Sequence, residues 1–571
     1  MKKVLNYTRL AMFFSLACLT TARHNVALAQ DKPIQITGSV QSDMMIAPET
    51  DNKIGATKDG YDNDAFLMNT YVDLMLQSKY VDAGARVEFM QWPMPGFQDA
   101  QNDNKFRGYG VPHVWAKLKL KNVDITAGTF YEQFGSGFIL RLYEERSLGI
   151  DNSLLGVRVK ARPFKGVSLT VLSGIQRNYW NWDNNLVSGA DAEISLDEYV
   201  KPLREHGYNF TVGGSWTNVR LDNEVVRKKD TPMLALNMPE FVNAFDVRMR
   251  LQKGGLSLLG EYAQKSQNPD ELNNYIYGKG TAAMISASYV KSGLSLLAQA
   301  KRSENMGFRT QRTLSKLCKS CYVNHLPAFT VDQTYALPAL YPYATQTDGE
   351  WAFQYGVGYK LKGRMAPKFK LNYSLVRGLE HNQENQQLGE EVMGTDGIKN
   401  SFFKMGDVYY QDLDLMYEQK LSKRYEHHFM YMYQQYNRGV IQEGSGNENI
   451  YSNIFVYEGK VKLNKKNTLR FELQSLLTQH ESGNWWYGLA EWSLVPHLMV
   501  SLSDMYGKVE NNGGEYGERE HFYKGAVTYN IKNHRIMLSY GRTRAGFNCT
   551  GGVCRFVPAN KGFTLNYNYN F

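Results

Sequence analysis

GFTLNYNYNF, residues 562–571, ends the chain and decides the fold that we expect for it. From Phe563 onward, aromatic or aliphatic residues alternate with small or polar ones. Successive side chains of a β-strand point to opposite faces, so this segment has one apolar and one polar face. The pattern predicts an antiparallel strand. Alternation by itself does not separate a membrane barrel from a soluble sheet, because both alternate.

The apolar positions of this strand also indicate a role in membrane insertion. A chain that ends on an aromatic residue resembles the last strand of outer-membrane β-barrels, which their insertion machinery reads. We therefore expect a membrane-insertion signal strand, with the barrel-insertion machinery and outer-membrane lipid as partners. Its apolar residues are Phe563, Leu565, Tyr567, Tyr569 and Phe571.

The amino terminus predicts export. Lys2, Lys3 and Arg9 precede an apolar stretch, and Ala27-Leu28-Ala29 follows as a small-x-small cleavage signature. This arrangement is typical of a secretory signal peptide over residues 1–29. The remaining residues, 30–571, contain no run near the roughly 18 apolar residues of a transmembrane helix. We expect the outer membrane of a Gram-negative bacterium as the location.

Composition favours one large domain. Aromatic residues make up 13% of the chain, with 38 Tyr against 16 Pro, which suits strands and membrane-interface belts. The mean hydropathy of −0.46 fits a barrel whose apolar residues are diluted by alternation. The net charge of +9 falls to about +5 without four basic residues of the signal, too little to indicate nucleic acid as a partner.

Short and long connections alternate along the chain. The strand at 34–46 is followed by a hairpin over 65–91 and a strand at 113–121. Short turns recur at 163–166, 253–255, 291–293, 422–424, 464–467 and 532–533, and long connections at 174–206, 302–349, 377–406, 438–449 and 541–560. The alternation fails near 209–241, which indicates a missed strand there or an unusually long periplasmic connection at 221–240. The total is roughly 22 to 24 strands, within the even-numbered barrel rule.

Individual strands have one apolar and one charged face. Trp351, Tyr355 and Tyr359 share one side of a strand, whereas Gln354 and Lys360 lie on the other. A barrel turns its apolar face to lipid and lines its lumen with mixed charges. Together with export, length and the terminal strand, this predicts an all-β fold: a single large antiparallel transmembrane β-barrel with long extracellular loops and short periplasmic turns.

The stretch 130–155, FYEQFGSGFILRLYEERSLGIDNSLL, departs from simple alternation. It breaks at Gly135 and Gly137 and then places several charges among apolar residues. These charges are candidates for a lumen constriction: Arg141, Glu144, Glu145, Arg146 and Asp151. The alternative is an ordinary charged barrel wall neutralised by Arg–Glu pairs. Because strand-like alternation begins at Ile34, occlusion of so large a lumen must come from the long loops or from another protein.

Two motifs resemble an uncharacterised family of Bacteroidota outer-membrane β-barrel proteins. They are FYEQFGSGFILR with ERSLGIDNSLLGVRV, and CTGGVCRFVPA before the last strand. The resemblance spans nearly the whole mature chain. It implies fold and location, and no activity.

Four cysteines remain after the signal, as CKSC and CTGGVC in predicted extracellular loops. Outside the cytoplasm an even number favours disulfides, without a choice of connectivity. A four-thiolate zinc site and a redox-active CKSC are the alternatives. The candidate disulfide residues are Cys318, Cys321, Cys549 and Cys554.

Catalysis, cofactors and resident metals are not expected. The sequence has no Walker loop, no HExxH, and no GxSxG in a strand-to-helix context. The loop at 326–351 carries Phe329, Tyr335, Tyr341, Tyr343 and Trp351, which indicates either membrane-interface aromatics or a surface for sugars or a protein. We expect a non-enzymatic, porin-like protein that passes or binds solutes or polypeptide at the cell surface. One alternative is a scaffold with a protein partner in an outer-membrane assembly, with protein secretion as a role for that assembly. The third is a barrel-type hydrolase using rim His residues.

Overall fold

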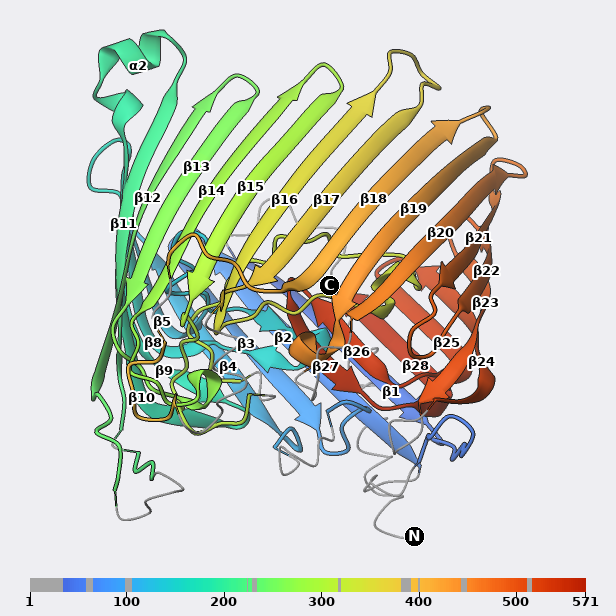
Figure 1. Ribbon diagram of the computed structural model, residues 1–571, viewed down its shortest axis with the longest axis horizontal. Helices are drawn as coiled ribbons and strands as arrows, with labels where there is room; N and C mark the ends of the chain where they lie inside the picture. The colour runs from blue at the N-terminus through green and yellow to red at the C-terminus, as the bar shows by residue number, and fades with distance from the viewer. Residues whose placement is uncertain are drawn as a thin grey trace.

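In the computed structural model, the chain forms one closed antiparallel β-barrel of 24 strands (Figure 1). The structure describes residues 34–57, 65–97, 105–222, 224–227, 234–316, 320–380, 392–398, 401–442, 449–510 and 516–571. The predicted signal peptide, residues 1–29, lies outside them. The expected all-β fold with a single large antiparallel barrel is confirmed.

The barrel strands follow one another around the wall in chain order. They are β1 (Ile34–Ile46), β2 (Phe66–Ser78), β3 (Val81–Met90), β4 (Gly108–Lys119), β5 (Val123–Phe130), β8 (Leu154–Ala161), β9 (Val167–Asn178), β10 (Asn181–Ser195), β11 (Asn209–Arg220), β12 (Phe241–Lys253), β13 (Leu256–Lys265), β14 (Gly280–Lys291), β15 (Leu294–Glu304), β16 (Gly349–Lys360), β17 (Lys368–Gly378), β18 (Val408–Lys420), β19 (Tyr425–Asn437), β20 (Asn449–Lys462), β21 (Asn467–Leu477), β22 (Trp485–Leu494), β23 (Leu498–Glu510), β24 (Tyr516–Ile531), β25 (His534–Thr543) and β28 (Asn560–Asn570).

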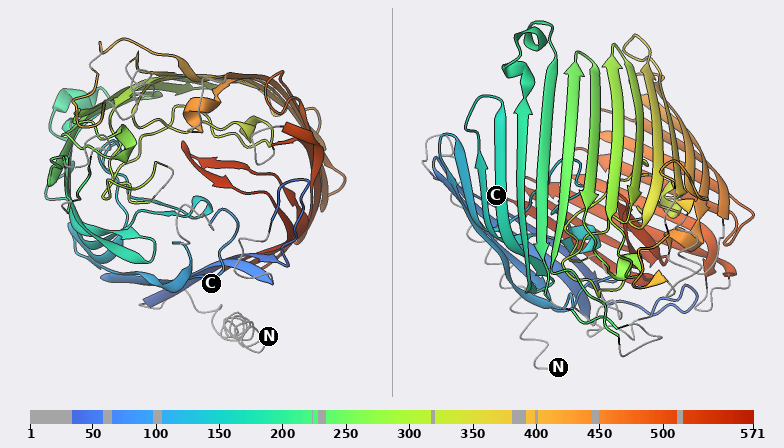
Figure 2. Two further views of the ribbon diagram at one scale, coloured as in Figure 1. Left: turned by 60° about the horizontal axis from the view of Figure 1, so that its bottom comes forward. Right: turned by 60° about the vertical axis from the view of Figure 1, so that its left-hand side comes forward.

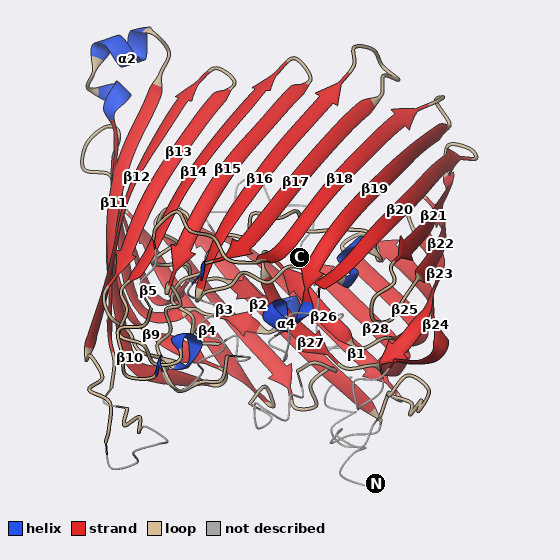
Figure 3. Ribbon diagram, in the orientation of Figure 1, coloured by secondary structure: helices blue, strands red, loops and turns tan. Residues whose placement is uncertain are grey.

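Two small hairpins and short helices lie in the connections (Figure 3). The hairpins are β6 (Glu144–Glu145) with β7 (Ile150–Asp151), and β26 (Gly546–Thr550) with β27 (Val553–Val557). The helices are η2 (Arg146–Leu148), η3 (Leu196–Glu198), α2 (Lys201–Glu205), η4 (Glu271–Asn273), η5 (Pro338–Leu340) and α4 (Arg438–Ile441). In the part of the chain that the structure describes, no helix is long and apolar enough to cross a membrane.

The last strand closes the barrel. β28 pairs with β25 on one side and with β1 on the other, where Phe563 lies opposite Ile46. Gly38 and Phe571 exchange two backbone hydrogen bonds of 2.9 Å each. The pairing of β28 with β1 from Gly38 onward therefore closes the barrel, so that these two strands do not remain as open edges of the sheet.

One prediction about strand number needs correction. The segment 174–206, expected to be a long loop, contains β10, which pairs with β9 and β11. The missing strand therefore lies before residue 209. β11 ends at Arg220 and β12 begins at Phe241, at the end of the barrel where the other long connections begin and end.

The wall has the two faces that alternation predicts. Large apolar side chains on the outer face are exposed, among them Val247, Tyr355 and Leu473. On the opposite face Arg248 pairs with Asp191, Glu193 and Asp246. Charges held away from bulk water need such partners.

Candidate functional site

Three long connections enter the barrel and meet inside it (Figure 2, left). We call the described residues of 131–153, 305–348 and 544–559 the plug. Backbone hydrogen bonds join the three segments: Arg141 N donates to Val323 O at 2.8 Å, and Thr345 N to Gly552 O at 2.9 Å. The lumen therefore contains long connections that lie far apart in the chain, as expected if the long loops enter it.

The first segment packs an apolar core against the wall. Phe134, Phe138 and Ile139 are at most 1% exposed. They form one cluster with Phe308 of the second segment and with inward wall residues such as Val187. Burial of each such side chain contributes about 1.5–3 kcal/mol. This part of the lumen is apolar, in contrast to the mixed charges that we expected throughout.

The second segment fills another part of the lumen. Phe329, Tyr341 and Tyr343 are 2–6% exposed and pack with wall residues including Tyr410 and Ile454. The prediction that these aromatic residues lie at the membrane interface or form an exposed binding surface is wrong. They lie within the barrel because the inner wall at this point is apolar, and packing against it removes apolar surface of both from water.

A wall carboxylate holds the FGSG turn. Ser136 donates to Glu261 from its backbone nitrogen, at 3.1 and 3.0 Å, and from Oγ at 2.6 Å. Gly135 and Gly137 have φ of 51° and 92°, a region that favours glycine. A Cβ at Gly135 would lie 2.6 Å from a carboxylate oxygen of Glu261. The two glycines therefore let the chain turn tightly against the wall.

An ionic cluster joins the plug to strands β2, β3, β4 and β9. Arg86 bonds to Asp73 and to Glu144 at 2.5 Å each. Arg146 lies 3.0 Å from both Asp73 and Glu144. Each of these two arginines therefore pairs with one acid of the wall and one acid of the plug, and the four groups form one network.

Arg177 of β9 forms the other half of the ionic cluster. Its guanidinium lies 2.7 Å from Glu88 and 2.6 Å from Asp151, and His113 lies 2.6 Å from Asp151. Burial opposes the charge of Asp151, but His113 and Arg177 outweigh burial and lower its pKa. The carboxylate therefore remains charged at neutral pH.

Glu88, His113 and Asp151 are also the one group of described residues spaced to hold a metal ion, with ligand atoms within 4.8 Å of one another. Nη1 of Arg177 lies 3.1 Å from Glu88, 3.3 Å from His113 and 2.6 Å from Asp151. The guanidinium therefore occupies the position that a metal would need.

The structure brings together only part of the predicted constriction. Glu144, Arg146 and Asp151 belong to the ionic cluster. Arg141 instead lies 5.1 Å from the ring of Tyr143, and Glu145 caps η2 by accepting from Ser147. The wall residues Asp73, Arg86, Glu88, His113 and Arg177 were missed by sequence reasoning. The sequence feature that could have identified them is a charged residue on the lumen face of an alternating strand. Many strands of the barrel share this feature, so it does not single these residues out.

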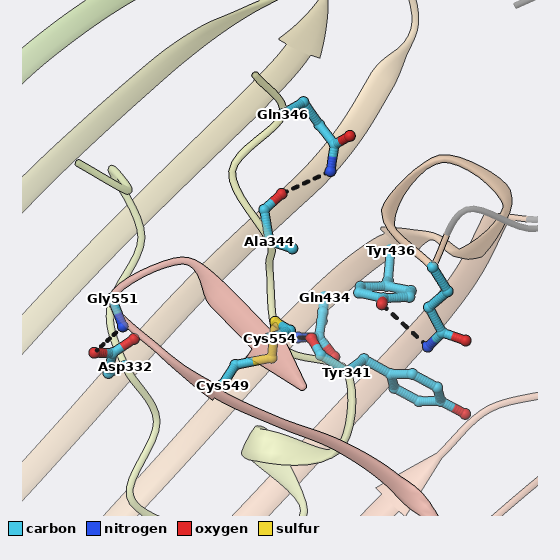
Figure 4. The surroundings of a disulfide bond; sticks show 10 residues. Asp332, Tyr341, Ala344, Gln346, Gln434, Tyr436, Cys549, Gly551 and Cys554 are labelled. Atoms are coloured by element: carbon cyan, nitrogen blue, oxygen red, sulfur yellow. Dashed lines mark hydrogen bonds between the residues drawn. A yellow bond between two sulfur atoms is a disulfide. The ribbon is translucent and has the colours of Figure 1, made fainter. Parts of the chain in front are cut away.

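The third segment is the hairpin β26–β27, and Cys549 and Cys554 form a disulfide across it (Figure 4). The pair lies inside the barrel, not in an outward loop, and its sulfur atoms are unavailable to a four-thiolate zinc site. Cys321 is buried, whereas Cys318 lies outside the described residues, so their pairing stays a prediction. Gly551, beside the disulfide, donates its N–H to Asp332 of the second segment at 3.1 Å (Figure 4).

The histidines available to a barrel-type hydrolase are His427, His428, His497 and His521. His521 pairs with Asp504 at 2.6 Å, with both side chains well exposed. Among the described residues, no serine or cysteine side chain is hydrogen-bonded to His521.

The model of a family of unknown function, DUF6029, matches residues 1–571. No curated protein matches the chain. Solved structures of outer-membrane barrels are similar at low identity. The siderophore receptor PirA from Pseudomonas aeruginosa is 10% identical with a TM-score of 0.40, covering 94% of this chain and 80% of that one. OccAB3 from Acinetobacter baumannii is 12% identical with a TM-score of 0.35, covering 94% of this chain and 99% of that one. The translocation pore of the P pilus usher PapC is 9% identical with a TM-score of 0.42, covering 94% of this chain and 99% of that one. Similarity at this level carries no conclusion about what the chain binds or transports.

Proposed function

Because the chain belongs to the DUF6029 family, whose function is unknown, we propose its role from the barrel and the plug. The protein is a non-enzymatic outer-membrane β-barrel that passes or binds solutes or polypeptide at the cell surface, and the plug gates its lumen. The exposed apolar side chains of the outer wall support the membrane location, since such a face is unfavourable in water and is covered by hydrocarbon in a lipid bilayer. The Bacteroidota origin and the signal peptide remain expectations from the sequence.

One observation carries the gating proposal: the contacts between plug and wall in the described residues are noncovalent. The disulfide Cys549–Cys554 lies within one segment, and Cys318 and Cys321 also belong to a single segment. Apolar packing, the Ser136–Glu261 hydrogen bonds and the ionic cluster attach the plug to the wall. Opening therefore requires no covalent change.

Single-channel conductance in a planar bilayer tests this function. We expect small or rare current steps from the mature protein. A variant in which residues 135–151 are replaced by a short Gly-Ser linker should give large, steady steps. The same deletion in cells should raise uptake of bulky antibiotics. Heat-modifiable migration in electrophoresis is the control that the variant is a folded barrel.

Two results would contradict the gating role. Large steady steps from the unmodified protein would mean that the plug leaves the lumen open. A folded deletion variant that stays silent would favour the alternative, a non-conducting scaffold in an outer-membrane assembly, and crosslinking in cells would then identify partners.

A further inference from the structure

The short turns form a basic rim at one end of the barrel. The connections between paired strands at this end are 79–80, 120–122, 162–166, 196–208, 254–255, 292–293, 361–367, 421–424, 463–466, 495–497 and 532–533. They contain thirteen Lys and Arg against three Asp and Glu. The three acids, Asp197, Glu198 and Glu205, all lie in the single connection 196–208.

Most of these cations have no acidic partner. Glu198 and Glu205 pair with Lys165 and Lys201 beside them. Lys423, Arg424, Lys465 and Lys466 are all exposed, and within the described chain no carboxylate lies within 4 Å of them. Like charges placed around one rim repel one another, so an anionic surface facing the rim would be stabilising.

Exposed apolar side chains stand next to these cations. Leu361 precedes Lys362, Leu463 lies two residues before Lys465, and Ile531 precedes Lys532. Leu361, Leu463 and Ile531 are 41%, 53% and 41% exposed. An apolar side chain beside a lysine suits the boundary between hydrocarbon and headgroups, where the first enters the acyl region and the second reaches the polar layer.

The two ends of the barrel differ in charge. In the connections at the plug end, Asp and Glu outnumber Lys and Arg. The basic character is therefore confined to one end and does not follow from the overall charge. Because basic turns recur around the rim and do not gather in one sector, they match a continuous plane better than a single protein partner.

We propose that this basic rim binds the anionic headgroups of the phospholipid leaflet on its side of the membrane. The proposal rests on the outer-membrane location proposed above, in which short turns face the periplasm. The rim then fixes the height and orientation of the barrel, since it can approach the anionic leaflet closely and the acidic plug end cannot. The ligand is an anionic phospholipid such as phosphatidylglycerol.

Native mass spectrometry of the mature barrel tests the assignment. The protein is released from micelles that contain equimolar dioleoylphosphatidylglycerol and dioleoylphosphatidylcholine. The number of molecules of each lipid that stay bound to the protein is then counted. We expect a preference for phosphatidylglycerol that weakens in high salt. Because one Lys or Arg near an anionic surface strengthens binding about fivefold, a rim variant should lower the preference by at least about fivefold. That variant combines Lys423→Gln, Arg424→Gln, Lys465→Gln and Lys466→Gln.

A matched control removes the same number of exposed charges from the plug end: Lys53→Gln, Lys105→Gln, Lys279→Gln and Lys404→Gln. It should keep the full preference. Equal retention of both lipids by the unmodified protein would overturn the proposal and leave an acidic protein as the partner that fits the rim. An equal loss in control and rim variant would also overturn it. Conductance is a separate readout, so this proposal and the gating role fail independently.

Discussion

Nε2 of His325 donates a hydrogen bond of 2.9 Å to the carbonyl oxygen of Gly551, a residue 226 positions further along the chain. The bond joins the second and third segments of the plug. The ring of His325 also packs against Tyr143 of the first segment, with ring centroids 5.5 Å apart. The imidazole of His325, which belongs to the second segment, therefore contacts the other two segments.

The plug should loosen in acid because of this histidine. Burial and the nearby Arg141 lower the pKa of His325 to about 4, against an ordinary value of 6.5. The docked plug gains stability that is fully present above pH 6.5 and is lost as pH falls toward 4, by about 3 kcal/mol. Hydrogen exchange at the Thr345 amide, corrected for intrinsic rate, should be faster at pH 5 than at pH 7.5.

His325→Gln is the control for this pH effect. Glutamine keeps a donor near the Gly551 carbonyl but does not titrate in this range. The variant should exchange at a rate independent of pH after correction. An equal acid response in both proteins would show that another group controls the docking.

Gly552→Ala should open the plug without harming the barrel. Gly552 has φ of 84°, and a Cβ there would lie 2.4 Å from Oγ1 of Thr345 and 2.8 Å from Cβ of Ala328. The clash separates the third segment from the second, so more frequent conductance steps are expected. Gly551→Ala is a matched control, because Gly551 also has positive φ but a Cβ there would meet nothing within 4 Å. Similar conductance from both variants would point to backbone strain and not to the contact.

Removal of the Arg177 charge should weaken the attachment of plug to wall. Arg177→Met removes the cation that Glu88 and Asp151 share, and breaking a buried pair in this way costs about 3–5 kcal/mol. The temperature at which the purified barrel loses its heat-modifiable migration should fall. Lys165→Gln removes an ion pair whose lysine is 78% exposed, so this variant should change the transition temperature little. An unchanged transition in Arg177→Met would mean that the ionic cluster does not stabilise the fold.

Intact mass should report the disulfides directly. Each disulfide removes two hydrogen atoms, so the difference between native and reduced protein counts the bonds. The Cys549–Cys554 bond is expected in protein purified without reductant, and a second bond would assign Cys318 to Cys321. Absence of the first bond in protein purified without reductant would contradict the closed hairpin. Reduction should increase conductance only modestly, because the bond lies within one segment.

Some elements of the candidate site were visible in the sequence and others were not. The break at Gly135 and Gly137 and the charges of 141–151 marked the first segment of the plug. Its partners on the wall, such as Glu261 and Arg177, look like any other polar residue of an alternating strand. Strand β10 was hidden because Asp191 and Glu193 make its sequence polar, and their partner Arg248 lies two strands away in β12.

The sequence by itself determined the all-β barrel. Alternation defines the faces of most strands, glycine- and lysine-rich turns mark their ends, and the terminal strand pairs as its pattern predicts. These signals are local, since a strand has a period of two residues and a turn needs a few special positions. Only the tertiary structure decided how the lumen is filled. The plug depends on contacts such as His325 with Gly551, and pairing between segments hundreds of residues apart leaves no periodic trace in either segment.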